Sequence, residues 1–141
     1  PQALPVAILK HNRTNRRLPQ MILDYLAVEQ EPLLLYTSAI DIPLKKLKNA
    51  RASFFKATEH EVPILFIDQT LLRSGKEGCI LTANGIYWKS YFQRPAQIPY
   101  SQLDSLQYKG DHLLINQLNF QTYSSFDYKL YRLLVRFKTL A

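Results

Sequence analysis

The chain has little cysteine, little glycine and no long apolar run. One cysteine, Cys79, among 141 residues excludes an internal disulfide framework and a cysteine-based zinc site, and it favours a reducing compartment. Four glycines and the absence of a low-complexity segment argue against wholesale disorder. No stretch reaches the roughly 18 consecutive apolar residues of a spanning helix. We therefore expect an ordinary folded domain located in the cytoplasm.

Catalytic motifs are also scarce. The three histidines, His11, His60 and His112, fall in separate segments, and none shows the H-x-x-x-H or H-x-H spacing of metal ligands. The chain has no G-x-S-x-G motif and no pair of carboxylates at helical spacing. We therefore expect no metal site, no cofactor and no enzymatic activity.

Apolar residues and positive charge are plentiful. Hydrophobic residues make up 47% of the chain, which is enough for a core, and the formal net charge is +7. A basic chain prefers anionic partners: nucleic acid, an anionic membrane surface or an acidic protein. The chain begins with Pro1 and Gln2 rather than methionine, which is consistent with a fragment or a processed product.

The first sixty residues carry helical signals. Pro19 suits a first helical position, and apolar residues follow it at helical spacing. Asp41 is an expected N-cap, with Pro43 just inside a second helix. One face of that helix is expected to hold Leu44, Leu47, Ala50 and Phe54, and the opposite face Lys45, Lys48 and Arg51. The run Leu33 to Tyr36 is either a short strand or helical.

After Val62 the spacing of apolar residues changes from that of helices to that of strands. Two β-rich runs flank Asn84-Gly85, the preferred pair for a type I′ hairpin turn. Seven short candidate strands lie between residues 63 and 123, and turn residues separate them, which predicts an antiparallel barrel or sandwich. An amphipathic helix then ends the chain, with an apolar stripe of Phe126, Leu130, Leu133, Leu134 and Phe137.

The segment RSGKEGC, residues 73–79, resembles a phosphate-binding loop at first sight. Its glycines have the wrong spacing for a P-loop, and a strand rather than a helix follows it. Gly75 and Gly78 are better explained as the positive-φ residues of a turn. The basic side chains around this turn, Arg73, Lys76 and Lys89, are the candidate anion-binding residues, although Glu77 adds a negative charge beside them.

A second basic group could serve nucleic acid or a membrane surface. Its members are Lys10, Arg13, Arg16 and Arg17 near the start of the chain and Lys129, Arg132 and Arg136 on the last helix. Strand aromatics such as Tyr87, Trp88, Tyr91 and Tyr108 could stack on bases, but packing in the core is the simpler role for them.

Residues 71–107 resemble the bacterial PH-like and GRAM-like domains of the pleckstrin-homology superfold. The family pattern of a glycine, three hydrophobic residues, a threonine and then Ile-Tyr falls on Gly78, Cys79, Ile80, Leu81, Thr82, Ile86 and Tyr87. A following segment of the family is similar to Ile98, Tyr100 and Leu103. The resemblance implies a barrel of about seven antiparallel strands capped by the C-terminal helix, in a binding and assembly module that is not an enzyme.

We thus expect an α+β chain with a helical extension over residues 1–60 and a PH-like barrel domain over residues 61–141. The expected function is non-catalytic binding or scaffolding. The expected partner is another protein, a second copy of the chain or an anionic membrane surface, in which case the chain would lie at the inner face of the membrane. Nucleic-acid binding through the basic cluster is the alternative.

Overall fold

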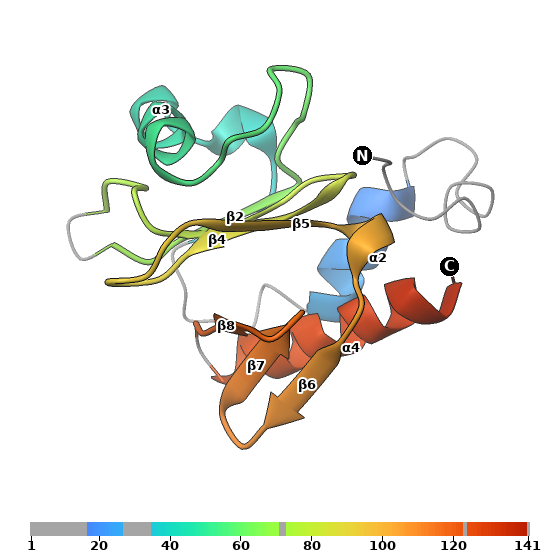
Figure 1. The fold of residues 1–141 in the computed structure, drawn as a ribbon. Helices are drawn as coiled ribbons and strands as arrows, with labels where there is room; N and C mark the ends of the chain where they lie inside the picture. Colours follow the sequence, from blue (N-terminus) through green and yellow to red (C-terminus); the bar gives the residue numbers. More distant parts are fainter. Residues whose placement is uncertain (1–16, 27–34, 71–72, 123, 141) are drawn as a thin grey trace. The chain divides into compact units, whose positions relative to one another are not determined.

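The computed structural model describes residues 17–26, 35–70, 73–122 and 124–140, and Figure 1 labels its helices and strands. The chain is an α+β protein whose described strands form two antiparallel sheets, one of five strands and one of three. Two compact units divide the chain. Leu33–Ile98 is one, called here the five-strand unit, and the segments before and after it form the three-strand unit. The boundary expected at residue 60 falls inside the five-strand unit, and the two predicted domains stay a prediction.

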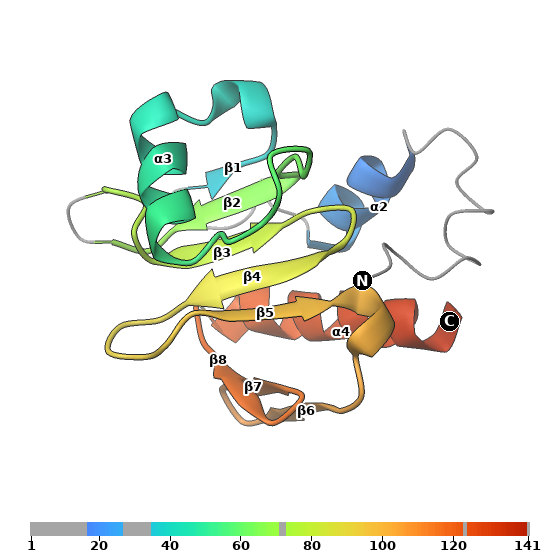
Figure 2. The same cartoon turned by 45° about the horizontal axis from the view of Figure 1, so that its top comes forward.

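The five-strand unit is a meander with one helix on it. In chain order its elements are β1 (Leu35–Tyr36), the 3-10 helix η2 (Ala39–Asp41), α3 (Leu44–Ser53), β2 (Leu65–Asp68), β3 (Gly78–Leu81), β4 (Gly85–Lys89) and β5 (Ala96–Pro99). The strands lie in the sheet in their order along the chain. The β2–β3 and β4–β5 loops therefore leave the sheet at the same end, as Figure 2 shows.

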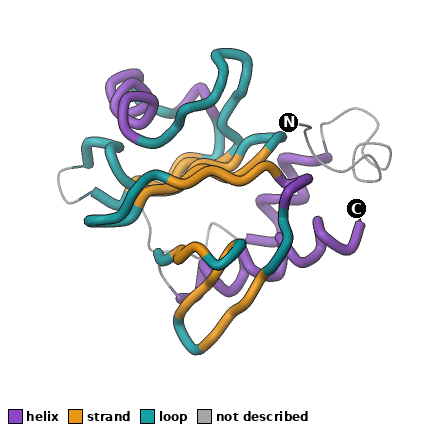
Figure 3. Tube along the Cα trace, viewed as in Figure 1, coloured by secondary structure: helices purple, strands orange, loops and turns teal. Residues whose placement is uncertain are grey.

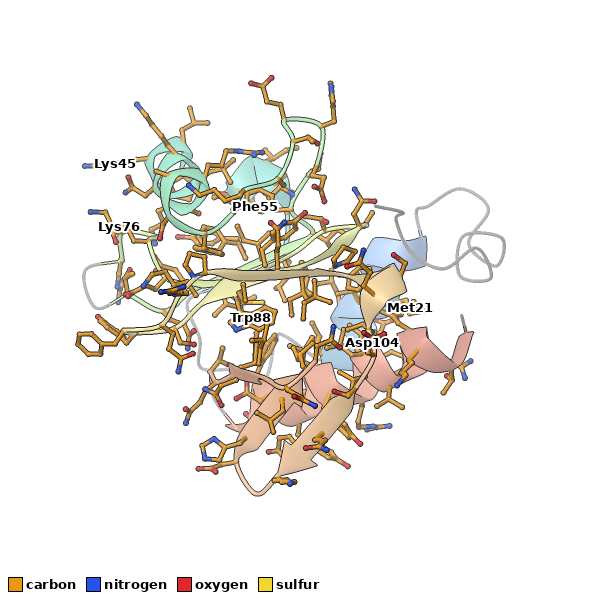
Figure 4. All side chains as sticks on the ribbon, in the orientation of Figure 1. Met21, Lys45, Phe55, Lys76, Trp88 and Asp104 are labelled. Carbon is orange, nitrogen blue, oxygen red and sulfur yellow. The ribbon has the colours of Figure 1, made fainter. Side chains whose placement is uncertain are left out.

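Aromatic side chains join α3 to this sheet. Phe54 lies 6.5 Å from Phe66 between ring centroids, and Phe55 meets Tyr87 edge-on at 5.0 Å. Figure 4 places Phe55 between α3 and the strands. Every residue of β2 and β3 is buried, which explains why their sequences, apart from Asp68 at the end of β2, are apolar rather than alternating.

The start of α3 differs from the sequence prediction. Asp41 is not its N-cap: Asp41 ends η2, whose own cap is Ser38, and α3 begins at Leu44 after Pro43. Pro43 is extended, with ψ 134°, so the chain must turn once more before it becomes helical. Leu44 is 85% exposed, so the predicted apolar face of α3 begins only at Leu47. Leu35–Tyr36 is a strand, and the first two residues of the open run Leu33 to Tyr36 lie outside the described residues.

The three-strand unit pairs a small sheet with the C-terminal helix. Its elements are α2 (Arg17–Leu26), the 3-10 helix η3 (Tyr100–Gln102), β6 (Leu106–Lys109), β7 (His112–Ile115), β8 (Leu118–Phe120) and α4 (Ser124–Leu140), and Figure 3 distinguishes its helices from its strands by colour. The predicted apolar stripe of α4 is confirmed, because all five of its residues are fully buried. Phe137 of this stripe packs edge-on against Tyr100 at 4.8 Å. α2 begins at Arg17, two residues before the predicted start.

Two hairpins differ from the sequence prediction in the type of their turns. The predicted hairpin around Asn84-Gly85 is confirmed, but the predicted type I′ turn is wrong, because neither residue has positive φ. The Thr82 side-chain oxygen instead accepts the amide hydrogens of Asn84 and Gly85, at 3.0 and 3.3 Å. Two consecutive positive φ angles, the mark of a type I′ turn, occur at Asn116 (50°) and Gln117 (68°) between β7 and β8.

The predicted number of strands is confirmed, but the closed barrel is not. The seven strands expected between residues 63 and 123 are β2 to β8, and the expected C-terminal helix is α4. These strands belong to two separate sheets, because η3 interrupts the chain between β5 and β6 and these two strands do not pair. Ile98, Tyr100 and Leu103, the last positions of the family pattern, are buried.

Candidate functional site

A pocket lies at the end of the five-strand sheet where the β2–β3 and β4–β5 loops emerge. Its volume is about 410 Å³. It takes side chains from the last turn of α3, from the loop after β2 and from the end of β4: Ser53, Thr70, Ser74, Lys76, Glu77, Lys89 and Tyr91. A site of this size with convergent polar groups is the ordinary setting for a small ligand or a headgroup.

The loop that forms most of this pocket is held against α3. Asn49 donates its side-chain amide to the Ser74 carbonyl at 2.8 Å, and Ser53 donates its hydroxyl to the Lys76 carbonyl at 2.6 Å. Gly75 has a φ of 80°, and a Cβ atom there would lie 2.7 Å from the Lys46 carbonyl oxygen. The positive φ predicted for this turn is therefore confirmed. The structure also shows that the backbone at Gly75 approaches α3 too closely for a side chain.

Asp68 fixes the base of the loop. Thr70 donates its amide N–H and its hydroxyl to Asp68 Oδ1, at 3.0 and 2.6 Å. The Thr70 oxygen in turn accepts the Ser74 amide at 2.7 Å. These bonds hold Ser74 next to Thr70 and Asp68 at the end of β2.

The charge of Asp68 is balanced by Lys46 of α3. The Lys46 Nζ atom lies 2.9 Å from Asp68 Oδ2 and donates to the Tyr36 hydroxyl at 2.9 Å. The Asp68 side chain is fully buried, and that of Lys46 is 13% exposed. Burial alone would raise the pKa of Asp68, but hydrogen bonds from Thr70 and Lys46 hold it below its ordinary value. Burial likewise opposes the charge of Lys46, but its bonds to Tyr36 and Asp68 raise its pKa.

Positive charge in the pocket comes mainly from Lys76. Lys76 is exposed, and in Figure 4 it points outward from the loop. Lys89 lies in the same pocket but donates to Glu77 at 3.2 Å, so this pair is neutral overall. Arg73 is exposed on the same loop, with a φ of 56°, but it does not line the pocket. Two of the three predicted anion-binding residues thus share one site, and the third lies beside it.

Aromatic side chains flank the pocket on the β4–β5 loop. Tyr91 lines the pocket and is 48% exposed, and its neighbour Phe92 is 100% exposed. The two ring centroids lie 5.8 Å apart. Phe92 also has a φ of 59°, a left-handed conformation that costs a bulky residue energy. The Phe92 ring therefore lies outside the core of the five-strand unit.

Sequence reasoning missed Phe92 and the hydroxyl-bearing residues of the pocket. Ser53 precedes the loop by some twenty residues, and only the packing of α3 on the loop brings it there. Phe92 had a signal that could have been used, because the aromatic pair Tyr91-Phe92 directly precedes Gln-Arg-Pro, and proline marks a turn or a strand end.

The second predicted basic group is only partly described. Lys10, Arg13 and Arg16 lie outside the described residues, and Arg17 begins α2 with its side chain outside them. On α4, Arg132 and Arg136 are exposed and Lys129 is half-buried. Of the aromatics expected on strands, Tyr87 and Trp88 are core residues, as expected, and Tyr108 is half-buried. Tyr91 is not on a strand: it lies after the end of β4 and is exposed.

A further polar cluster is part of the core structure. The Glu61 carboxylate accepts the Tyr87 hydroxyl at 2.7 Å and the Thr82 hydroxyl at 2.9 Å. Burial and the bond to Glu61 raise the pKa of Tyr87 well above its ordinary value. None of these three residues lines the pocket. Cys79 is fully buried, and within the described ranges no three His, Cys, Asp or Glu residues gather as metal ligands would.

Comparison with known proteins gives no assignment. No protein-family model matches the chain, and neither the curated proteins nor the solved structures searched contain a match. Among the described helices, none has both the length and the apolar character needed to cross a bilayer.

Proposed function

We propose that the chain is a non-catalytic binding module that docks on an anionic membrane surface through the pocket of the five-strand unit. The observation that carries this proposal is the fully exposed Phe92 beside a lysine-bearing pocket. Aromatic rings favour the boundary between headgroups and acyl chains, and lysines favour the negative headgroups next to it.

Charge within the pocket limits what the ligand can be. Lys76 and Lys89 supply two positive charges and Glu77 removes one, so the lining carries a net charge of +1. A highly charged free phosphate compound would need more cations than that. A single anionic headgroup matches this net charge better. At a charged leaflet each lysine contributes about 1 kcal/mol of binding free energy, and an inserted phenylalanine contributes about 2 kcal/mol.

The order of the strands and helices along the chain also supports a binding module. Strands β2 to β8 and then the amphipathic helix α4 follow the order of elements that the resemblance to PH-like domains implies, although the strands form two sheets rather than a closed barrel. We propose that kinship on this order and on the motif at residues 78–87. A peripheral location at the inner face of a membrane belongs to the same proposal.

Co-sedimentation with lipid vesicles tests the proposal. The chain is expected to bind vesicles that contain phosphatidylserine and to stay in solution with phosphatidylcholine alone. Phe92→Ser should weaken binding about 10- to 30-fold through lost apolar burial. Lys76→Glu should weaken it by a similar factor, because it reverses one charge at the surface.

Two variants in the three-strand unit are matched controls. Leu118→Ser removes another exposed apolar side chain, 47% exposed on β8, and Lys109→Glu reverses another exposed lysine. Both should leave vesicle binding unchanged within about twofold. Equal recovery with charged and neutral vesicles, or equal losses in the control and pocket variants, would remove the membrane function and leave a protein partner as the alternative.

A further inference from the structure

Three tyrosines form an aromatic cluster on the three-strand unit. Tyr108 of β6 lies 5.3 Å from Tyr128 and 5.9 Å from Tyr131 of α4, between ring centroids. Tyr128 and Tyr131 are 6.4 Å apart, with their ring planes tilted by only 32°. Tyr128 is 48% exposed, and the other two rings are half-buried. The cluster is called here the tyrosine face.

The tyrosine face is separate from the apolar stripe of α4. None of the three tyrosines belongs to that fully buried stripe, and Tyr128 and Tyr131 lie three residues apart on the flank of the helix. Three adjacent aromatic rings at a surface offer stacking area with little loss of side-chain entropy, since each ring has only two rotatable bonds.

Positive charge adjoins the tyrosine face. Arg132 follows Tyr131 directly and lies one helical turn after Tyr128, and Arg136 lies one turn further. Both arginines are exposed, and neither guanidinium has an ion pair within the part of the chain that the structure describes. The acid nearest in sequence, Asp127, is fully buried, and it accepts the amide of Thr122 at 2.9 Å. The exposed charge that α4 places beside the rings is therefore positive.

Stacking rings beside guanidinium groups fit a polyanion that has flat, unpaired bases. Single-stranded nucleic acid is bound in this way, with bases on aromatic rings and phosphates on arginines. A duplex hides the faces of its bases, so it cannot use the rings. A proline-rich peptide would also pack on tyrosines, but it has no charge for Arg132 and Arg136 to bind.

We propose that Tyr108, Tyr128, Tyr131 and Arg132 form a binding site for single-stranded nucleic acid, with Arg136 extending it. The site belongs to the three-strand unit, shares no residue with the pocket, and is independent of the proposed membrane function. Bases stack on the exposed ring of Tyr128 and beside Tyr131, and Arg132 contacts the backbone phosphate between them.

Fluorescence anisotropy of the full chain with a labelled single-stranded oligouridylate tests this site. Tyr128→Ala is expected to lower the affinity about 5- to 100-fold, the effect of losing one stacked base. Tyr128→Phe keeps the ring and should bind as the unchanged chain does. Arg132→Ala should lower the affinity and reduce the slope of log affinity against log salt by about 1.

Tyr91→Ala is the matched control, because Tyr91 has the same exposed fraction as Tyr128, 48%, but lies in the five-strand unit. Its affinity should not change. The proposal is overturned if the oligonucleotide does not bind, or if the two alanine variants lose affinity equally. It is also overturned if only Arg13→Ala and Arg16→Ala lower the affinity, or if a proline-rich peptide competes at the tyrosine face while the oligonucleotide does not. An unchanged thermal midpoint for Tyr128→Phe and Tyr128→Ala shows that both variants fold.

Discussion

The two units bury their strands differently. In the five-strand unit β2 and β3 are buried at every residue, whereas β6 and β7 of the three-strand unit alternate between more and less exposed residues. The pocket of the first unit consequently takes its polar groups from the end of the sheet, from the loop after β2 and from the last turn of α3, where hydrogen bonds hold the loop. The second unit presents side chains from the elements themselves, and its tyrosine face comes from a strand and a helix. A buried sheet therefore exposes polar side chains at its end, and a half-exposed sheet exposes side chains along its side.

Glycine substitutions should show the largest difference in stability between the two units. Gly78→Ala places a Cβ atom 1.9 Å from the Ile67 carbonyl oxygen, at a φ of 148°, between two buried strands. We expect the free energy of unfolding to fall by about 3–5 kcal/mol, or the chain not to fold.

Gly110→Ala is the counterpart in the three-strand unit. Gly110 has a φ of 64°, but no atom lies within 4 Å of its added Cβ. Only backbone strain remains, so a loss of about 1 kcal/mol is expected. Urea unfolding of both variants measures the difference, and equal losses would contradict the close approach of β3 to β2.

The buried ion pair gives the next largest effect. Lys46→Met leaves the Asp68 carboxylate buried, and Oδ2 has no other hydrogen-bond partner among the described residues. We expect a loss of about 3 kcal/mol at neutral pH, measured by urea unfolding. Lys45→Met, on the exposed side of the same helix, is the control and should change stability by less than about 0.5 kcal/mol.

The same pair predicts a pH dependence. The folded-state pKa of Asp68 lies below its ordinary value of 3.8, so its stabilisation is complete above that value and is lost as the pH falls through the lowered pKa. Lys46 has a pKa raised above 10.5, so its contribution is complete below 10.5 and is lost at higher pH. Lys46→Met should therefore weaken the loss of stability in acid. An unchanged acid profile would mean that Lys46 does not hold Asp68 charged.

The β7–β8 turn should show a smaller effect. The Asn116 side chain accepts the amides of Asp104 and Ser105, at 2.7 and 3.1 Å, and donates to the Gln102 carbonyl at 2.8 Å. Asn116→Ala removes these bonds and leaves alanine with a φ near 50°, so we expect a loss of about 2 kcal/mol by thermal unfolding. A loss below about 0.5 kcal/mol would show that the turn does not fix the sheet to η3.

The smallest effect has the opposite sign. Phe92→Gly removes the left-handed strain at φ 59° and an exposed ring, so the free energy of unfolding should rise by about 0.5–1 kcal/mol. Tyr100→Ala is the contrast, because its ring is buried against Phe137 and its loss should cost about 3 kcal/mol. A fall in stability for Phe92→Gly would mean that the ring supports the fold.

Local signals in the sequence predicted the strands, the hairpins and the apolar stripe of α4, because period and turn residues act over a few positions. They did not predict the split into two sheets. Whether β5 and β6 pair depends on contacts that no local pattern encodes, and in the structure they do not pair. Lys76 and Lys89 were predicted to lie together because they flank one hairpin. Ser53 and the tyrosine face were missed, since α3 reaches the loop and Tyr108 reaches α4 only after folding.

Amide chemical-shift mapping of the whole chain with phosphatidylserine-containing bicelles locates the membrane-binding surface residue by residue. We predict that the amides of residues 73–78 and 89–94 shift and broaden, while those of β6 and of α4 around Tyr128 keep their positions. Shifts centred on β6 and α4, with the pocket loops unchanged, would contradict the assignment of the membrane surface to the five-strand unit.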